Sequence, residues 1–241
     1  MIMRLSLPLL LCALFFVACS DDAAPQPAAG AGKPDAPAGQ PLPKVADHAA
    51  LRDPTKATLK APDKFEVAFE TTKGNFVVEV ERAWAPNGAD RFFNLVSIGY
   101  YNDVRFFRVI RNFVAQFGMH GDPTVHSVWS ANNARIPADR VMKSNMRGTL
   151  TYAMQQDPGS RTNQMFINLR DNARLDNSGF AAFGRVSSGM DVVDALYNGY
   201  GDGPPQGSGP SQDKISKLGN AYLDEDFPKA DAIKSAKIVT K

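Results

Sequence analysis

The stretch that most constrains the fold of this chain is residues 106–118, which read FFRVIRNFVAQFG. Its aromatic and β-branched residues favour a strand that is buried on at least one face. Arg108 stands out there, because a cation on such a strand needs a partner or a function. Arg108 and Ile110 share one face by the two-residue period of a strand. The next two residues break the alternation, so the sequence does not reveal the face of Gln116. An arginine that snorkels from a barrel wall, with Gln116 as an ordinary edge residue, would also explain this segment.

A second unusual strand covers residues 163–169. One of its faces is apolar, and the other carries Phe166 between the amides of Gln164 and Asn168. An aromatic ring flanked by amides suits a shallow peptide-binding cleft, in which the ring is an apolar floor and the amides hold backbone groups. A phenylalanine covered by a neighbouring loop is the structural alternative. This strand alone does not decide between the two.

Taken together, these pieces resemble the cyclophilin-type peptidyl-prolyl cis-trans isomerases, from about residue 65 to the C-terminus. The motifs that carry the resemblance are, in order, FRVI (107–110) with NFVAQFG (112–118), GTL (148–150) with AM (153–154), NQMFI (163–167), and LD (175–176) with FGRV (183–186). Four ordered motifs at compatible spacings make the resemblance specific.

The resemblance implies a catalytic set of Arg108, Phe113 and Gln116. Arg108 is the expected catalytic arginine, Gln116 positions it, and Phe113 forms one wall of the proline pocket together with Phe166. The rest of the substrate groove is expected to be lined by Val114, Ala153, Met154, Gln164, Leu175 and Phe180.

Some positions depart from the family pattern. Val114 stands where methionine is frequent, and Phe117 replaces the first glycine after the glutamine. Many eukaryotic members carry a tryptophan at the position of Arg174 and a histidine at that of Phe180. These changes bear on inhibitor binding more than on catalysis, because the arginine, phenylalanine and glutamine core is intact.

The implied chemistry needs neither a cofactor nor a metal. Rotation about an X-Pro bond breaks no covalent bond, but amide resonance imposes a barrier of roughly 18 to 20 kcal/mol. A guanidinium aimed at the prolyl nitrogen can bond the lone pair that appears as that nitrogen leaves conjugation. The alternative function is a non-catalytic peptide-binding or surface adhesion module on the same barrel. Such a module could lose Arg108 without penalty, so the presence of Arg108 favours catalysis.

Other chemistries and partners have weaker support. A metal site of His120, His126 and Asp122 is conceivable, but the chain has no HExxH spacing and no cysteine nearby, so we expect no metal. No serine has a nucleophile-elbow context. The formal net charge of +2 and the lack of a clustered basic stripe argue against a nucleic-acid partner. We expect a monomer that acts on unfolded or extended proline-containing polypeptides.

The N-terminus predicts export and lipidation. Residues 1–18 read as a lipoprotein signal peptide, whose apolar run over residues 5–17 is shorter than the about 20 residues needed to span a bilayer. The string FVAC resembles a bacterial lipobox with Cys19 as the lipidated residue. No aspartate directly follows Cys19, which favours the periplasmic face of the outer membrane over the inner membrane. Phe16 departs from the usual lipobox residue, so cleavage without lipid and a soluble periplasmic protein is the alternative.

The rest of the chain divides into residues 19–62, with the lipidated cysteine and an Ala/Pro/Gly-rich linker, and residues 63–241, the isomerase domain. With 44% hydrophobic residues and no cysteine after Cys19, the domain must be held by its core. The patterns predict a mainly β domain with helices at 86–99 and 190–197. Strands are expected at 65–70, 76–81, 105–110, 149–154, 164–169, 180–186 and 233–239. The resemblance implies a closed eight-stranded antiparallel β-barrel capped by two α-helices.

Overall fold

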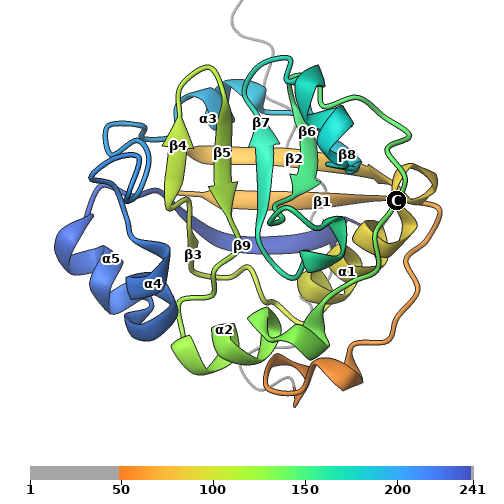
Figure 1. Cartoon of the computed structure of the whole chain (residues 1–241), viewed down its shortest axis with the longest axis horizontal. Coiled ribbons are helices and arrows are strands. Elements are labelled where there is room, and N and C mark those ends of the chain that lie inside the picture. Colours follow the sequence, from red (N-terminus) through yellow and green to blue (C-terminus); the bar gives the residue numbers. More distant parts are fainter. Residues whose placement is uncertain (1–48, 240–241) are drawn as a thin grey trace, which may run out of the picture. The chain divides into compact units, whose positions relative to one another are not determined.

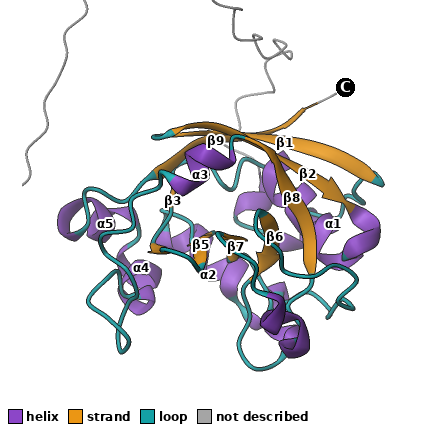
Figure 2. Cartoon of the chain, turned by 90° about the horizontal axis from the view of Figure 1, so that it is seen from above, coloured by secondary structure: helices purple, strands orange, loops and turns teal. Residues whose placement is uncertain are grey.

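The computed structural model describes residues 49–239, so the predicted signal peptide, Cys19 and most of the predicted linker lie outside the described residues. Nine strands form one antiparallel sheet (Figure 1). The strands are β1 Lys64–Thr71, β2 Gly74–Glu81, β3 Val104–Arg105, β4 Arg108–Ile110, β5 Val114–Phe117, β6 Thr149–Tyr152, β7 Met165–Asn168, β8 Ala182–Ser188 and β9 Ala232–Val239. They follow the order β3-β9-β1-β2-β8-β6-β7-β5-β4. Figure 2 shows β9, β1, β2 and β8 arching over β5, β7 and β6, so the sheet curls.

The prediction of a closed eight-stranded barrel is wrong, because the sheet has nine strands and remains open. Its outermost strands, β3 and β4, do not pair with each other, although only Phe106 and Phe107 separate them along the chain. The Phe106 N–H donates to the carbonyl of Asp231 at 2.8 Å. Because Asp231 directly precedes β9, this bond holds Phe106 next to β9. The outer edge of β4 pairs instead with a loop, through a bridge between Val109 and Gly201. The strand expected at residues 105–110 is therefore split in two.

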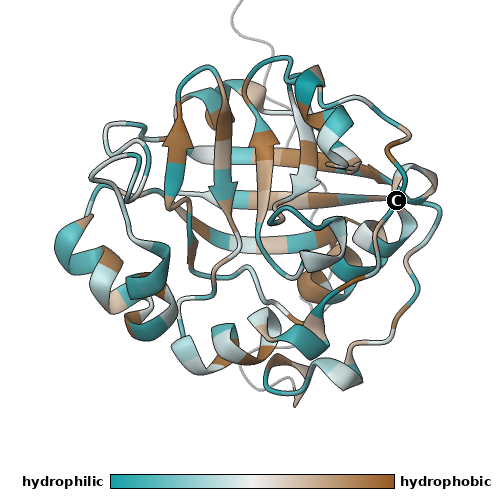
Figure 3. Ribbon diagram, in the orientation of Figure 1, coloured by the Kyte–Doolittle hydropathy of each residue, from teal (hydrophilic) through white to brown (hydrophobic). Residues whose placement is uncertain are grey.

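Five α-helices lie in the described part of the chain, where the sequence predicted two. They are α1 Pro86–Ser97, α2 Pro123–Ser130, α3 Met190–Asp194, α4 Gln212–Leu218 and α5 Asn220–Asp226. Short 3-10 helices cover Ala49–Leu51, Pro54–Lys56, Arg82–Trp84, Asn132–Ala134, Pro158–Ser160 and Ala173–Ser178. Figure 3 shows α4 and α5 as mainly hydrophilic helices with isolated hydrophobic residues. Because α4 buries only Ile215, and α5 only Tyr222 and Leu223, neither shows the apolar stripe that identifies a helix from sequence.

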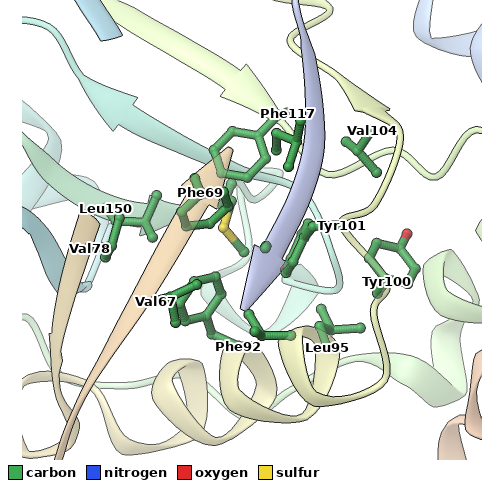
Figure 4. Close-up of a cluster of buried hydrophobic side chains, with 14 of the residues drawn as sticks. Val67, Phe69, Val78, Phe92, Leu95, Tyr100, Tyr101, Val104, Phe117 and Leu150 are labelled. Atoms are coloured by element: carbon green, nitrogen blue, oxygen red, sulfur yellow. The ribbon is translucent and has the colours of Figure 1, made fainter. Parts of the chain in front are cut away.

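The main core lies between the inner face of the sheet and α1. Figure 4 shows Phe69, Phe117 and Phe92 of α1 among the residues of this core, and the Phe69 ring centroid lies 6.2 Å from those of both Phe92 and Phe117. The Phe69 and Phe76 rings stack with their centroids 4.7 Å apart. Burial of each such side chain contributes about 1.5 to 3 kcal/mol to stability. Because alternate residues of a strand point to opposite faces, the inner face is used for packing and the outer face of β4, β5, β7 and β6 is left for other contacts.

Residues 49–62, which the sequence places in the linker, contact the helices. The amide of Asn94 accepts from the Leu59 N–H at 2.9 Å and donates to the Leu59 carbonyl at 2.6 Å. The Trp129 indole N–H donates to the Leu51 carbonyl at 3.0 Å. The domain boundary at residue 63 stays a prediction. Among residues 49–239, no helix combines the length and hydropathy that a membrane span requires.

Candidate active site

Three of the predicted site residues, Arg108, Gln116 and Phe166, lie in one row across four strands on the outer face of the sheet. Arg108 of β4 lies opposite Gln116 of β5, Gln116 lies opposite Phe166 of β7, and Phe166 lies opposite Thr151 of β6. The next residues along β5, Ala115 and Phe117, belong to the main core. The face of Gln116, which the sequence left open, is decided by the β4–β5 turn. Asn112 adopts a φ of +58° there, and Ile110 pairs with Val114, so the alternation resumes in phase with Arg108.

The Arg108 guanidinium has three hydrogen-bonded contacts within the chain. Its Nη1 donates to Gln116 Oε1 at 3.0 Å, its Nε to Asp202 Oδ1 at 2.8 Å and its Nη2 to Asp202 Oδ2 at 2.9 Å. The guanidinium carbon lies 5.7 Å from the centre of the Phe113 ring. Arginine offers five N–H donors, and these contacts use three of them, so two N–H groups are left for a substrate. With 22% of its side chain exposed, Arg108 is oriented and still accessible.

A chain of amides continues from Arg108 across the outer face. Gln116 Nε2 donates to Gln164 Oε1 at 3.0 Å, and Gln164 Nε2 donates to Gln212 Oε1 of α4 at 3.2 Å. Four predicted site residues, Gln116, Ala153, Met154 and Gln164, line one cavity of about 470 Å³. Most of its other lining residues are polar, from α2, α4 and the loops 131–135 and 155–162. The structure therefore brings these four together beside Arg108 and lines the space with hydrogen-bonding groups.

The remaining predicted residues are not among those that line this cavity. Phe166 is buried, and its ring meets that of Phe180 edge to face with centroids 5.7 Å apart. Leu175 and Phe180 are joined through the Ala173–Ser178 helix, where the Phe180 N–H bonds to the Leu175 carbonyl at 3.3 Å. Val114 is buried opposite Asn168. Arg174, at the position of the family tryptophan, lies with its guanidinium carbon 5.1 Å from the centre of the Phe113 ring.

Sequence reasoning missed a buried polar network that holds the segment of Leu175 and Phe180 against the sheet. Asp176 accepts from the Asn145 backbone N–H at 2.9 Å and from its side-chain amide at 2.7 Å. Asn145 Oδ1 in turn accepts from Thr151 at 2.8 Å and from Asn168 at 3.2 Å. Burial alone would raise the pKa of Asp176, but the hydrogen bonds from Ser144 and Asn145 outweigh it and lower that pKa. The many Asn residues of this region were the only signal in the sequence, and their partners are distant along the chain.

His126 lines the cavity but is not arranged as a catalytic base. Its Nδ1 lies 3.4 Å from the Asn163 side-chain nitrogen and its Nε2 lies 3.2 Å from Ser216 Oγ. An amide nitrogen donates, so Nδ1 accepts and the neutral ring holds its proton on Nε2, facing the serine. Across residues 49–239 no three His, Cys, Asp or Glu side chains are grouped to hold a metal.

The buried His126 predicts a specific dependence of stability on pH. Burial, with a smaller effect of His120, lowers the His126 pKa from 6.5 to about 4, and burial also lowers the His120 pKa. Below pH 6.5 the unfolded chain therefore binds protons that the folded chain does not. We expect the free energy of unfolding to fall as the pH drops from 6.5 toward 4, by up to about 1.4 kcal/mol per pH unit from His126, and the lowered His120 pKa acts in the same direction. Urea titrations across this range should show a shallower fall for His126→Gln. An equal slope in both proteins would contradict this assignment.

A family model described as "Cyclophilin type peptidyl-prolyl cis-trans isomerase/CLD" matches residues 66–220, well over half of the 241 residues. The chain belongs to this family. The match contains every predicted site residue from Arg108 to Phe180, and also Asp202 and Gln212.

Named relatives agree with this membership. The cyclophilin is 38% identical over 136 residues to a peptidyl-prolyl cis-trans isomerase of Acinetobacter baylyi, covering 55% of this chain and 71% of the relative. It is 32% identical over 174 residues to peptidyl-prolyl cis-trans isomerase B of Escherichia coli, covering 69% of this chain and 94% of the relative. This cyclophilin is accordingly a peptidyl-prolyl cis-trans isomerase.

The fold also matches solved cyclophilins. A Cryptosporidium parvum cyclophilin aligns with a TM-score of 0.54 and 20% identity, covering 74% of this chain and 99% of that one. A second structure of that protein, in the presence of the dipeptide Ala-Pro, aligns with a TM-score of 0.50 and 20% identity over 73% and 99% of the two chains. At this identity the likeness shows the fold.

Proposed function

We propose that this cyclophilin accelerates rotation about X-Pro bonds in unfolded or extended exported polypeptides, with Arg108 donating a hydrogen bond to the prolyl nitrogen. The observation that carries the proposal is the guanidinium itself, which is fixed by Gln116 and Asp202 and keeps two N–H groups for a substrate. The structure of the Cryptosporidium parvum cyclophilin in the presence of the dipeptide Ala-Pro supports a proline-containing ligand for this fold.

The magnitude of the arginine effect can be bounded. In the planar ground state the prolyl nitrogen lone pair is delocalised, and it becomes an acceptor only as the bond twists. A hydrogen bond from Arg108 therefore stabilises the transition state more than the ground state. A hydrogen bond that involves a charged group contributes on the order of 1.5 to 3 kcal/mol, which corresponds to about one to two decades in rate. The remaining acceleration must come from how the groove holds the proline.

The groove offers groups for that purpose on both sides of Arg108. The aromatic rings of Phe113, Phe166 and Phe180 supply apolar surface for a pyrrolidine ring, and Phe113 lies directly under the guanidinium. The amides of Gln116 and Gln164 can hold the backbone of an extended peptide along the cavity. We propose that Phe113 and Phe166 contact the proline ring and hold it in place while the carbonyl group of the preceding residue rotates about the X-Pro bond.

A refolding assay tests the proposed role in folding. X-Pro isomerisation takes tens to hundreds of seconds without a catalyst and can limit refolding. We expect catalytic amounts of this cyclophilin to shorten the slow phase of a protein whose refolding is limited by a proline. A protein that only docks peptides would leave the rate of that phase unchanged or slow it. Such a result would favour the peptide-binding alternative.

We also propose that the protein is a monomer anchored in the cell envelope by lipid on Cys19, facing the periplasm from the outer membrane. The support is the sequence alone: an apolar run too short to span a bilayer ends in FVAC. Several acyl chains on one residue would make a firm anchor, where a single chain is marginal.

Replacement of Cys19 tests this anchoring. We expect Cys19→Ser to leave the protein unprocessed or soluble, with unchanged isomerase activity, because the substitution lies far from the domain in sequence. Cell fractionation with a fatty-acid label checks both points. Cys12→Ser is the matched control and should retain label and membrane association. A wild-type protein that is unlabelled and free in the periplasm would exclude lipidation and leave the isomerase assignment intact.

A further inference from the structure

Asp202 contacts Arg108 directly, although none of the family motifs in the sequence includes it. The two carboxylate oxygens accept from Nε at 2.8 Å and from Nη2 at 2.9 Å. Two parallel bonds of this kind fix the plane of a guanidinium as well as its position. The pair is partly shielded, with 22% of the Arg108 side chain and 28% of the Asp202 side chain exposed. Asp202 lies in the loop of residues 199–211, far from Arg108 along the chain.

The first end of the 199–211 loop is attached to the catalytic strand. Gly201 forms a β-bridge with Val109, the residue after Arg108. Tyr200 packs between two aromatic rings, with centroid distances of 4.8 Å to Tyr197 and 4.9 Å to Phe227. Residues 200–201, which directly precede Asp202, are therefore fixed to β4 and to Phe227, the residue after α5.

The other end of the loop is attached to a second small core. The Ser211 N–H donates to the Tyr222 hydroxyl at 3.2 Å, and Tyr222 packs in a cluster with Phe107, Met119, Ile215 and Leu223. Phe107 is the residue before Arg108, so this cluster also supports the catalytic strand. Helices α4 and α5 thus anchor the loop to the same short stretch of chain that carries Arg108.

Asp202 is also bonded within the loop. Its carbonyl accepts from the Gly209 N–H at 2.8 Å, and its Oδ1 accepts from the Gly203 N–H at 3.0 Å. The hydrogen bond from Arg108 lowers the Asp202 pKa, so the carboxylate stays ionised at neutral pH. With the loop attached at both ends and across its middle, the carboxylate is held in place before a substrate arrives.

We propose that Asp202 is a positioning residue, which acts with Gln116 to hold the Arg108 guanidinium in the orientation that catalysis needs. The inference rests on the proposed role of Arg108. The prolyl nitrogen lone pair is an uncharged acceptor, so the direction of the donated N–H matters more than the net charge of the site. Gln116 alone restrains one nitrogen and leaves the guanidinium free to turn about that contact. The two parallel hydrogen bonds from Arg108 to the Asp202 carboxylate, the Asp202 fork, remove this freedom. They still leave two N–H groups of Arg108 for a substrate.

An inhibitory role for Asp202 makes the opposite prediction. If the carboxylate blocked Arg108, a substrate would have to displace it, and removing it would raise activity. The two unused N–H groups and the attachment of the loop at both ends favour positioning, since neither displacement nor loop opening is needed.

The test measures kcat and KM of the full-length protein on an X-Pro peptide. In Asp202→Asn the new amide N–H faces the guanidinium and breaks the fork, so we expect kcat to fall about five- to tenfold with KM within about twofold. Asp202→Glu can remake the fork and should recover part of the loss. Asp226→Asn removes the same charge from the exposed end of α5 and should behave as wild type. Wild-type or increased kcat in Asp202→Asn would overturn the proposal.

Two further readouts separate positioning from a purely structural role. The Arg108 Nε–H signal in NMR spectra should be protected from exchange in the wild type and in Asp226→Asn, and lost in Asp202→Asn. In an Arg108→Lys background, which cannot form the fork, Asp202→Asn should cause less than about a twofold further loss. An equal loss in both backgrounds would show that Asp202 acts on the fold and not on Arg108. A wild type without isomerase activity would overturn the proposed function, and the NMR signal would still report whether the fork exists.

Discussion

Arg108→Ala is expected to lower the isomerase rate by at least about tenfold while the domain stays folded. In the proposed mechanism the guanidinium stabilises the transition state. The Arg108 side chain lies on the outer face of the sheet and belongs to neither hydrophobic cluster. A protease-coupled assay gives the rate, and a thermal melt checks the fold. Gln116→Ala should have a smaller effect, because in the proposed mechanism this amide orients the arginine and does not itself contact the prolyl nitrogen.

A matched control is available in the same hairpin. Arg111 is an exposed arginine in the turn between β4 and β5, so Arg111→Ala removes the same charge three residues from Arg108. Its activity should be close to wild type. Near-normal activity in a folded Arg108→Ala protein would exclude the arginine mechanism. Equal losses in Arg108→Ala and Gln116→Ala would indicate a more direct role for the glutamine.

Arg161→Ala is expected to destabilise the fold by about 3 to 5 kcal/mol, because it leaves Asp139 buried without its cation. Each side chain of this pair is 1% exposed, and Arg161 Nη1 donates to Asp139 Oδ2 at 3.1 Å. The arginine also donates to the carbonyls of Pro137 and Pro158. Asp139 further accepts from the backbone N–H groups of Asn87 and Gly88 at 3.0 and 2.9 Å, in the first turn of α1. The pair thus ties two loops beside the 470 Å³ cavity to a helix of the core.

Urea titration measures this effect, and the chain offers a surface pair for comparison. Arg185 Nη2 lies 3.1 Å from Glu79 Oε2, and 59% of the arginine side chain and 30% of the glutamate side chain are exposed. Because water screens such pairs, Arg185→Ala should cost at most about 1 kcal/mol. A loss below about 1 kcal/mol in Arg161→Ala as well would contradict the reading of Arg161 as a structural buried cation.

The sequence predicted the elements whose patterns are local. The β1–β2 hairpin follows from the alternation of apolar and polar residues, and α1 follows from its helical apolar stripe. The outer-face position of Phe166 follows from its place between two amides on the polar face of its strand. The pairing of Arg108 with Gln116 could not be read from alternation, because the phase depends on the positive φ of Asn112 in the turn. The family resemblance supplied that pairing instead.

What the sequence did not predict depends on contacts between distant segments. The edge of β4 in the open sheet bridges to Gly201, and no local pattern around Gly201 indicates a strand partner. Asp202 sits among glycines and prolines that read as an ordinary surface loop, and α4 and α5 are too polar to show a stripe. Arg161 likewise follows a Pro-Gly turn in a segment that reads as exposed. In each case the tertiary partner decides the role of the residue.

The most direct test of the central claim is two-dimensional NMR exchange on a short Ala-Pro-Phe type peptide at equilibrium. A catalyst must speed both directions equally. We therefore predict that catalytic amounts of the wild type produce exchange cross-peaks between the cis and trans signals without changing their populations. Arg108→Ala should produce much weaker cross-peaks at the same concentration. Peptide signals that shift on binding while cis and trans forms fail to exchange would contradict catalysis and identify a protein that only docks its ligand.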